Sequence, residues 1–203
     1  DHIHETIEYS DFNYVYDIAF SPDSSALVSG GGDRFVLVSD VETGKIIKSF
    51  AAEGIIFTVS FNPDGSAIAW GDDRNLVTTM DLVTNQKKVI KFHSNQVIDI
   101  TFSPDGKYLA STGSDGKIVV TNRDNAASPL ILMRNPSQVV RSNTITYSPD
   151  GIYIISGNED GNLFIWNASQ SGNYEIGSIQ AYTTPITGLA FSPDGTSIAI
   201  SGT

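Results

Sequence analysis

One short phrase recurs five times in this chain: an aromatic residue, then Ser or Asn, then Pro-Asp. The aromatic positions are Phe20, Phe61, Phe102, Tyr147 and Phe191, so successive copies stand 41, 41, 45 and 44 residues apart. A fixed period of this length is typical of an array of similar supersecondary units, each of which buries its apolar faces against its neighbours. The period therefore constrains the fold more than any other feature of the sequence.

Two further phrases keep the same register. The second is a two-residue phrase near the end of each unit's second apolar run, Ser-Gly in three of the units: Ser29-Gly30, Trp70-Gly71, Ser111-Thr112, Ser156-Gly157 and Ser201-Gly202. The third closes each full unit: Ser39-Asp40, Met80-Asp81, Thr121-Asn122 and Trp166-Asn167. Three phrases that stay in step over four units indicate one repeated structure.

Each unit divides into four short strands. Tyr16, Ile18 and Phe20 alternate along the first strand of the first unit, and the opposite face carries small or apolar residues, so we expect this strand to be buried on both faces. Pro-Asp-Gly then makes a tight turn. The remaining strands are expected at 26–30, 67–71, 108–112, 153–157 and 197–202 (second), 35–40, 76–81, 118–122 and 163–167 (third), and 45–50, 87–92, 130–133 and 174–179 (fourth).

Four-stranded units of this length predict an all-β fold, a β-propeller of four-stranded antiparallel blades. No stretch has a helical period, and the 18 glycines fit a chain rich in turns. We expect four complete blades plus partial blade elements at both ends. The predicted units are 12–53, 54–94, 95–138, 139–182 and a partial 183–203, with 1–11 as the outer strand of a preceding unit. Either the chain belongs to a larger ring, of seven blades or a double propeller, or it closes a small ring; the first is favoured because open blade edges would aggregate.

The three phrases resemble those of the WD40-repeat β-propeller family, over nearly the whole chain. The Trp-Asp dipeptide of that family is degraded here, and of its repeat-opening Gly-His only His93 survives. The resemblance implies buried hydrogen-bond networks of His, Asp, Ser and Trp within the blades, and no unit has the full set. The residues at matching positions are Ser29, Asp33, His93, Ser111, Asp115, Ser156, Asp160 and Trp166; the second unit departs most, with Trp70 and Arg74 there instead.

The charge narrows the range of partners. Asp and Glu number 23 against 12 Lys and Arg, for a net charge of −11, so direct binding to nucleic acid or to an anionic membrane is not expected. A protein or peptide with a basic face fits this field better. No apolar run reaches the roughly 18–20 residues that would span a bilayer. The absence of cysteine excludes disulfides and thiolate metal sites, and we expect an intracellular protein, cytoplasmic or else nuclear.

The sequence predicts no catalytic residue, no metal site and no cofactor. His2 and His4 with Asp1 or Glu5 could bind a transition metal, but a solvated terminal strand is the favoured interpretation. His93 is interpreted as structural, and the Asp-Gly pairs lack the spacing of a calcium loop. Neither a nucleophile elbow nor a phosphate-binding loop occurs.

The predicted function is therefore a non-enzymatic protein–protein interaction scaffold, a subunit of a larger complex, that binds its partner on one face of the propeller. Function in such folds usually resides in loops around the central channel, and aromatic and Arg side chains are favoured binding anchors. The candidate partner-binding residues are Tyr14, Tyr16, Arg34, Phe57, Arg74, Gln96, Arg141 and Tyr182. A purely architectural blade array remains an alternative, and an enzymatic or metal-binding propeller is a weaker one.

Overall fold

The computed structural model describes residues 14–133, 139–168 and 175–203, and all regular elements in these ranges are β-strands. They form four antiparallel sheets of four strands and one of two. The strands are β1 (Val15–Phe20), β2 (Ala26–Gly31), β3 (Phe35–Asp40) and β4 (Ile46–Ala51); β5 (Ile56–Phe61), β6 (Ala67–Asp72), β7 (Val77–Asp81) and β8 (Lys87–Ile90); β9 (Val97–Phe102), β10 (Tyr108–Gly113), β11 (Ile118–Asn122) and β12 (Leu130–Leu132); β13 (Ser142–Tyr147), β14 (Tyr153–Asn158), β15 (Asn162–Asn167) and β16 (Glu175–Gln180); and β17 (Ile186–Phe191) with β18 (Ile198–Gly202).

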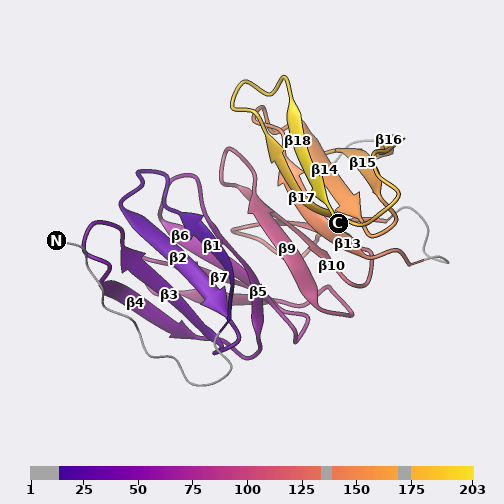
Figure 1. The fold of residues 1–203 in the computed structure, drawn as a ribbon. Helices are drawn as coiled ribbons and strands as arrows, with labels where there is room; N and C mark the ends of the chain where they lie inside the picture. Colours follow the sequence, from indigo (N-terminus) through magenta and orange to yellow (C-terminus); the bar gives the residue numbers. More distant parts are fainter. Residues whose placement is uncertain (1–13, 134–138, 169–174) are drawn as a thin grey trace.

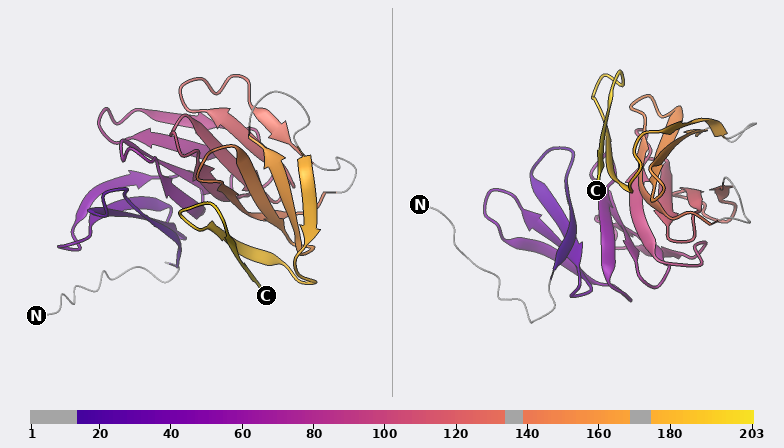
Figure 2. Two further views of the ribbon diagram at one scale, coloured as in Figure 1. Left: turned by 90° about the horizontal axis from the view of Figure 1, so that it is seen from above. Right: turned by 45° about the vertical axis from the view of Figure 1, so that its right-hand side comes forward.

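The five sheets are successive blades of a propeller, and the predicted fold class is confirmed. Within each blade the strands pair in chain order, and the first strand of each blade contacts the first strand of the next, from β1 through β5, β9 and β13 to β17. Figures 1 and 2 show the blades following one another around an arc, from indigo to yellow. No helix of the described part is long and apolar enough to cross a membrane.

The recurring Pro-Asp phrase builds the turn between the first two strands of each blade. In the third blade, Ser103 Oγ donates to Asp105 Oδ1 at 2.7 Å and accepts from the Tyr108 backbone N–H at 2.9 Å. Gly106 takes a φ of 69°, which a residue with a Cβ adopts at a cost. The bond from Ser103, with that from the Lys107 backbone, lowers the pKa of Asp105. The phrase therefore recurs because each blade has the same hydrogen-bonded turn between its first two strands.

Each inner strand begins with a β-bulge. The pairing with the second strand skips one residue near the start of β1, β5, β9, β13 and β17. A bulge leaves that residue outside the ladder and redirects its side chain. The skipped residues are Tyr16, Phe57, Ile98, Asn143 and Thr187.

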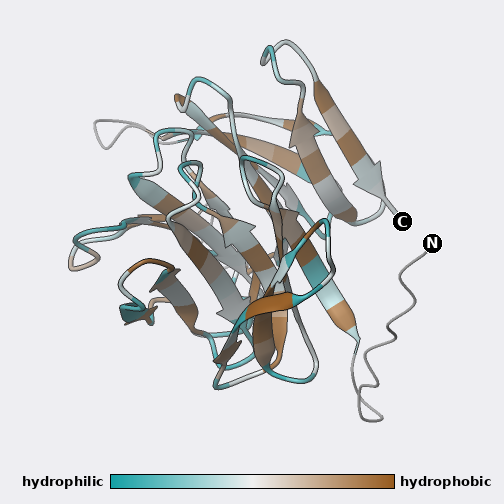
Figure 3. Ribbon diagram, turned by 90° about the vertical axis from the view of Figure 1, so that its left-hand side faces the viewer, coloured by the Kyte–Doolittle hydropathy of each residue, from teal (hydrophilic) through white to brown (hydrophobic). Residues whose placement is uncertain are grey.

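Blades pack large side chains of one inner strand onto small residues of the blade before it. A Cβ added at Gly71 would lie 2.5 Å from Val97 Cγ1, so only glycine lets the third blade approach this closely. Gly30 faces Ile56 in the same way. Hydrophobic and hydrophilic residues accordingly alternate in bands along the strands (Figure 3). The core lies between blades, as in the cluster that joins Val28 of the first to Phe61 of the second.

The expected burial of the first inner strand on both faces is wrong. Tyr16, Ile18 and Phe20 are 52%, 54% and 59% exposed, whereas the equivalent Val59 and Phe61 of the second blade are 4% and 9% exposed. In later blades this face is covered by the preceding blade, and no described residue covers it in the first. The pattern of a strand encodes which face is apolar, whereas its burial depends on a neighbour.

The outer strands deviate slightly from the predicted ranges. β4 begins and ends one residue later than expected, and β8 ends at Ile90 because residues 91–96 already lead to the next blade. The outer strand predicted over 1–11 lies outside the described residues. Within each complete blade, the four strands lie side by side in the order in which they occur in the chain.

Candidate functional site

The bulged residues lie at one end of the inner strands, where the turns between second and third strands also emerge. Tyr16 and Phe57 form an edge-to-face pair with ring centroids 5.5 Å apart and an interplanar angle of 61°. Tyr16 is half exposed and Phe57 partly buried. The first two blades thus present an aromatic pair that their own ladders do not use.

The next three bulged residues line a common pocket. Ile98, Asn143 and Thr187 surround a hollow of about 360 Å³ together with Arg141, Glu159 and Pro185. The Asn143 side-chain amide donates to the Ile186 carbonyl at 3.1 Å, which fixes the side chain across two blades. A hollow with apolar walls, one cation and one anion can hold a side chain of a partner.

The eight predicted partner-binding residues are distributed along the same end of the blades. Tyr14 is 72% exposed, Arg34 and Arg74 are exposed in turns, and Arg74 Nε lies 4.0 Å from Asp73. Gln96 is partly buried and its carbonyl accepts from the Ser114 N–H. In the described ranges no hydrogen bond or ion pair joins any two of the eight, although Tyr16 and Phe57 do make their ring contact.

Two predicted residues have structural tasks as well. The Tyr182 hydroxyl donates to the Ile200 carbonyl at 3.2 Å, so this side chain links the fourth blade to the fifth. The Arg141 backbone carbonyl accepts from the Glu159 N–H. The exposed Arg141 residue also lines the pocket.

Ile98, Asn143 and Thr187 were missed as candidate contacts by the reasoning from sequence. Each stands four residues before the aromatic residue of its repeat, as Tyr16 and Phe57 do. That constant offset was readable in the sequence. Its meaning was not, because an alternating pattern does not reveal which position is skipped by the ladder.

A buried network holds the third blade together. His93 Nδ1 lies 3.0 Å from Asp115 Oδ1, and His93 Nε2 lies 2.9 Å from Ser111 Oγ. The Ser94 N–H donates to Asp115 Oδ2 at 2.8 Å, and Lys117 Nζ lies 3.5 Å from the same oxygen. Burial alone would raise the pKa of Asp115, but the hydrogen bonds from His93 and Ser94 hold it well below its usual range.

The predicted networks of the other blades are only partly joined. In the fourth, Trp166 Nε1 donates to Ser156 Oγ at 3.0 Å, whereas Asp160 is exposed and its carboxylate accepts only from the Asn162 N–H among the contacts described. In the first, Asp33 accepts from the Phe35 N–H, and no described hydrogen bond joins it to Ser29.

A cavity of about 470 Å³ lies between the third and fourth blades, lined in part by Ser142, Ser156 and Trp166. The fourth-blade counterpart of His93 is residue 138, which lies outside the described residues.

Carboxylates on the inner strands connect neighbouring blades. Asp17 Oδ2 accepts from the Val59 N–H at 2.8 Å, and Asp99 Oδ2 accepts from the Ile145 N–H at 2.9 Å. Desolvation raises the pKa of Asp99 to about 6, against the lowering effect of the Ile145 bond. These groups are fixed by backbone amides of the adjacent blade and therefore serve structure.

The described residues contain no group of three or more His, Cys, Asp or Glu side chains placed to hold a metal ion. The pair His2 and His4 lies outside the described residues. The described geometry thus leaves exposed side chains and hollows at the ends of blades and places buried polar links between blades.

Comparison with protein families gives the class of this protein. The family model described as WD domain, G-beta repeat (WD40) matches residues 5–40, 84–122, 134–167 and 173–203. The chain belongs to the WD40-repeat family. Such repeats generally mediate protein–protein interaction and scaffolding, and their proteins are generally non-enzymatic. No curated protein matches the chain significantly. The region 41–83, between the first two matches, contains the divergent Trp70 and Arg74, yet the second blade, to which both residues belong, has the same four strands as the others.

Proposed function

We propose that this protein is a non-enzymatic scaffold that binds a protein or peptide partner at the bulged ends of its inner strands and supports assembly of a larger complex. The observation that carries the proposal is the rim of bulged side chains: the Tyr16–Phe57 pair and the pocket around Ile98, Asn143 and Thr187. Each of these side chains is released from its ladder, so the rim can contact a partner without disturbing the sheets.

The chemistry of the rim favours a peptide-like partner. Aromatic and Arg side chains dominate binding hot spots because they combine large apolar area with polar groups. Arg141 and Glu159 at the pocket can orient polar groups of a bound chain, and the net charge of −11 favours partners with a basic face. We further propose that the protein acts inside the cell, in the cytoplasm or the nucleus.

The test compares one charge reversal on the rim with a matched one on the opposite end of the blades. A partner is first identified by crosslinking to the unaltered protein. Its affinity for Arg141→Glu and for Lys45→Glu, which lies in an exposed turn on the far end, is then measured by calorimetry. We expect at least a tenfold loss for Arg141→Glu and less than a twofold change for Lys45→Glu. Equal affinities of the partner for both variants would show that the rim is not the binding site.

An architectural array is the second candidate, and the outer strands provide the observation for it. Ile176 and Ile179 on β16 are 54% and 55% exposed, which leaves apolar side chains on a blade edge. If Ile176→Ser with Ile179→Ser abolishes partner binding while Arg141→Glu does not, the contact lies on the edge and the architectural role is the correct one.

A further inference from the structure

One repeat position lies just beyond the third strand of each complete blade. Its backbone N–H donates to the carbonyl of the residue that follows the Pro-Asp turn, at 2.8–2.9 Å in all four blades. This shared hydrogen bond makes the four residues structurally equivalent. They are Val41, Leu82, Arg123 and Ala168.

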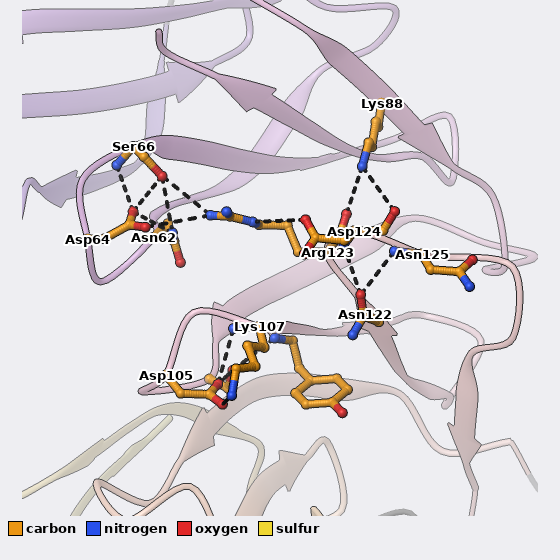
Figure 4. Close-up of polar contacts among 12 residues, drawn as sticks. Asn62, Asp64, Ser66, Lys88, Asp105, Lys107, Asn122, Arg123, Asp124 and Asn125 are labelled. Carbon is orange, nitrogen blue, oxygen red and sulfur yellow. Dashed lines mark hydrogen bonds and ion pairs between the residues drawn. The ribbon is translucent and has the colours of Figure 1, made fainter. Parts of the chain in front are cut away.

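In the third blade this position sends a cation back to the preceding blade. Arg123 Nη1 lies 3.9 Å from Asp64 Oδ2 and 3.4 Å from Ser66 Oγ, and Arg123 Nε lies 3.8 Å from Asp124. Figure 4 shows the guanidinium extending from its own blade to the turn of the second. The side chain is 29% exposed, so the junction between the second and third blades is occupied by an arginine of the chain itself.

The junction between the third and fourth blades has the same backbone hydrogen bond but no arginine side chain at this position. Ala168 ends at its Cβ, and a groove of about 740 Å³ lies between the turn of the third blade and that of the fourth. Asp105 corresponds in the repeat to Asp64. The groove is lined by the turn residues and by two tyrosines, Tyr108 and Tyr147, with Ala168 among the lining residues.

The lining of this groove suits a planar cation. Asp105 and Asp150 provide two carboxylates whose pKa values are lowered by hydrogen bonds from Ser103 and Ser148 within their turns. Tyr147 replaces the phenylalanine found at this repeat position in the other blades, and Tyr108 and Tyr147 both line the groove. Aromatic faces and carboxylates together attract guanidinium groups.

Lys107 is the one competing cation that the described structure places at this carboxylate pair. Its Nζ lies 3.3 Å from Asp105 Oδ2, and its side chain is 71% exposed. An exposed Lys–Asp pair contributes little, because solvent screens it and the lysine loses rotamer freedom. A guanidinium that makes two parallel bonds to the carboxylate can therefore displace the lysine.

We propose that the groove between the third and fourth blades binds an arginine side chain of a basic partner segment, in the place that Arg123 fills one junction earlier. The groove lies at the end of the blades opposite the bulged rim, because antiparallel strands place the two sets of turns at opposite ends. The proposal is thus independent of rim binding, and a partner could engage both ends.

The test uses a capped Gly-Arg-Gly peptide and, as its neutral isostere, the same peptide with citrulline. Binding to the 203-residue chain is followed by ¹⁵N amide shifts during titration. We expect saturable shifts at Tyr108, Tyr147 and Ile152 with the arginine peptide, with a Kd on the order of 1 mM, and at least tenfold weaker binding of the citrulline peptide. Equal binding of the two peptides would overturn the proposal.

Two variants and a matched control complete the design. Ala168→Arg places a guanidinium in the groove from within, as Arg123 does, and should weaken peptide binding at least tenfold. Asp105→Asn should also weaken peptide binding at least tenfold. Asp23→Asn is the control, because Asp23 is the equivalent turn carboxylate at the junction between the first and second blades, where Leu82 takes the place of Arg123. It should change the affinity for the peptide less than twofold. Unchanged binding by Ala168→Arg, or an equal loss with Asp23→Asn, would show general attraction to an acidic surface and refute the site.

Discussion

Asp99 on the inner strand of the third blade accepts a hydrogen bond from the Ile145 N–H on the inner strand of the fourth, at 2.9 Å. Its other carboxylate oxygen accepts from Thr58 Oγ1 of the second blade at 3.3 Å. One side chain therefore connects three blades at a level where no backbone ladder crosses between sheets. Asp17 makes the corresponding link from the first blade to Val59.

This link predicts a pH dependence of stability. The pKa of Asp99 is raised to about 6 in the folded protein, from about 3.9 in an unfolded chain, so the folded state holds the proton more tightly. Stability from this group is fully present below about pH 4 and is lost as the pH rises through about 6, by on the order of 2 kcal/mol. Urea unfolding at pH 4.5 and 7 should show this loss in the unaltered protein and a flatter profile in Asp99→Asn.

Asp194→Asn is the control for that measurement. The pKa of Asp194 is lowered to about 2 by bonds from Ser192 and Thr196, so its titration lies below the pH window in question. Its profile between pH 4.5 and 7 should parallel that of the unaltered protein. A profile for Asp99→Asn as steep as that of the unaltered protein would contradict the raised pKa.

The two equivalent aspartates of the third and fourth blades should differ sharply in their contribution to stability. Asp115 is buried and bonded to His93, Ser94 and Lys117, so Asp115→Asn should cost about 2–3 kcal/mol of unfolding free energy. Asp160 is exposed and its carboxylate accepts from one backbone N–H, so Asp160→Asn should cost less than about 1 kcal/mol. Denaturant melts of both variants check this, and equal costs would show that the His93 network adds little.

Close approach between blades predicts coupled effects at Gly71 and Val97. Gly71→Ala forces its Cβ to 2.5 Å from Val97 Cγ1 and should cost about 1–3 kcal/mol through overpacking. Val97→Ala removes the nearest of the clashing atoms and leaves Val97 Cβ at 2.9 Å, so the double variant should be more stable than the sum of the two single effects implies. Gly177→Ala, where nothing lies within 4 Å of the added Cβ, should be nearly neutral. Additive effects at Gly71 and Val97 would contradict the contact.

The same repeat position should respond differently in the first and second blades. Val59→Ser places a hydroxyl in the interface between blades and should cost about 2–4 kcal/mol, because Val59 is 4% exposed. Ile18→Ser alters a side chain that is 54% exposed and should cost less than about 1 kcal/mol. Thermal unfolding of the two variants checks the difference. A large cost for Ile18→Ser would mean that the face of the first strand is covered in solution.

Much of the fold was predictable because the strands and turns of each blade are encoded by residues close together in the sequence. Phe102, Pro104 and Gly106 mark the end of a strand and the turn that follows; the same spacing recurs three more times, and in the first blade Ser24 takes the place of the glycine. The exposed face of β1 was not predictable, because Ile18 and Val59 look alike in sequence and differ only in what packs on them.

The candidate sites were less accessible from sequence. Tyr16 and Phe57 were recognised as aromatic anchors, but the bulge that frees them depends on a skipped pairing that composition does not encode. The equivalence of Arg123 and Ala168 emerges only when the shared backbone hydrogen bond is seen. The tie between Asp99 and Ile145 joins residues 46 positions apart, and no local pattern predicts which amide a carboxylate will meet.

The bulge at the start of every inner strand has an evolutionary consequence. Because the skipped residue takes no part in pairing, a substitution at Tyr16, Phe57, Ile98, Asn143 or Thr187 alters the proposed binding surface while the ladder beside it persists. If partners bind there as proposed, selection can change the binding specificity one blade at a time, because each repeat contributes one residue that can vary independently of the sheet.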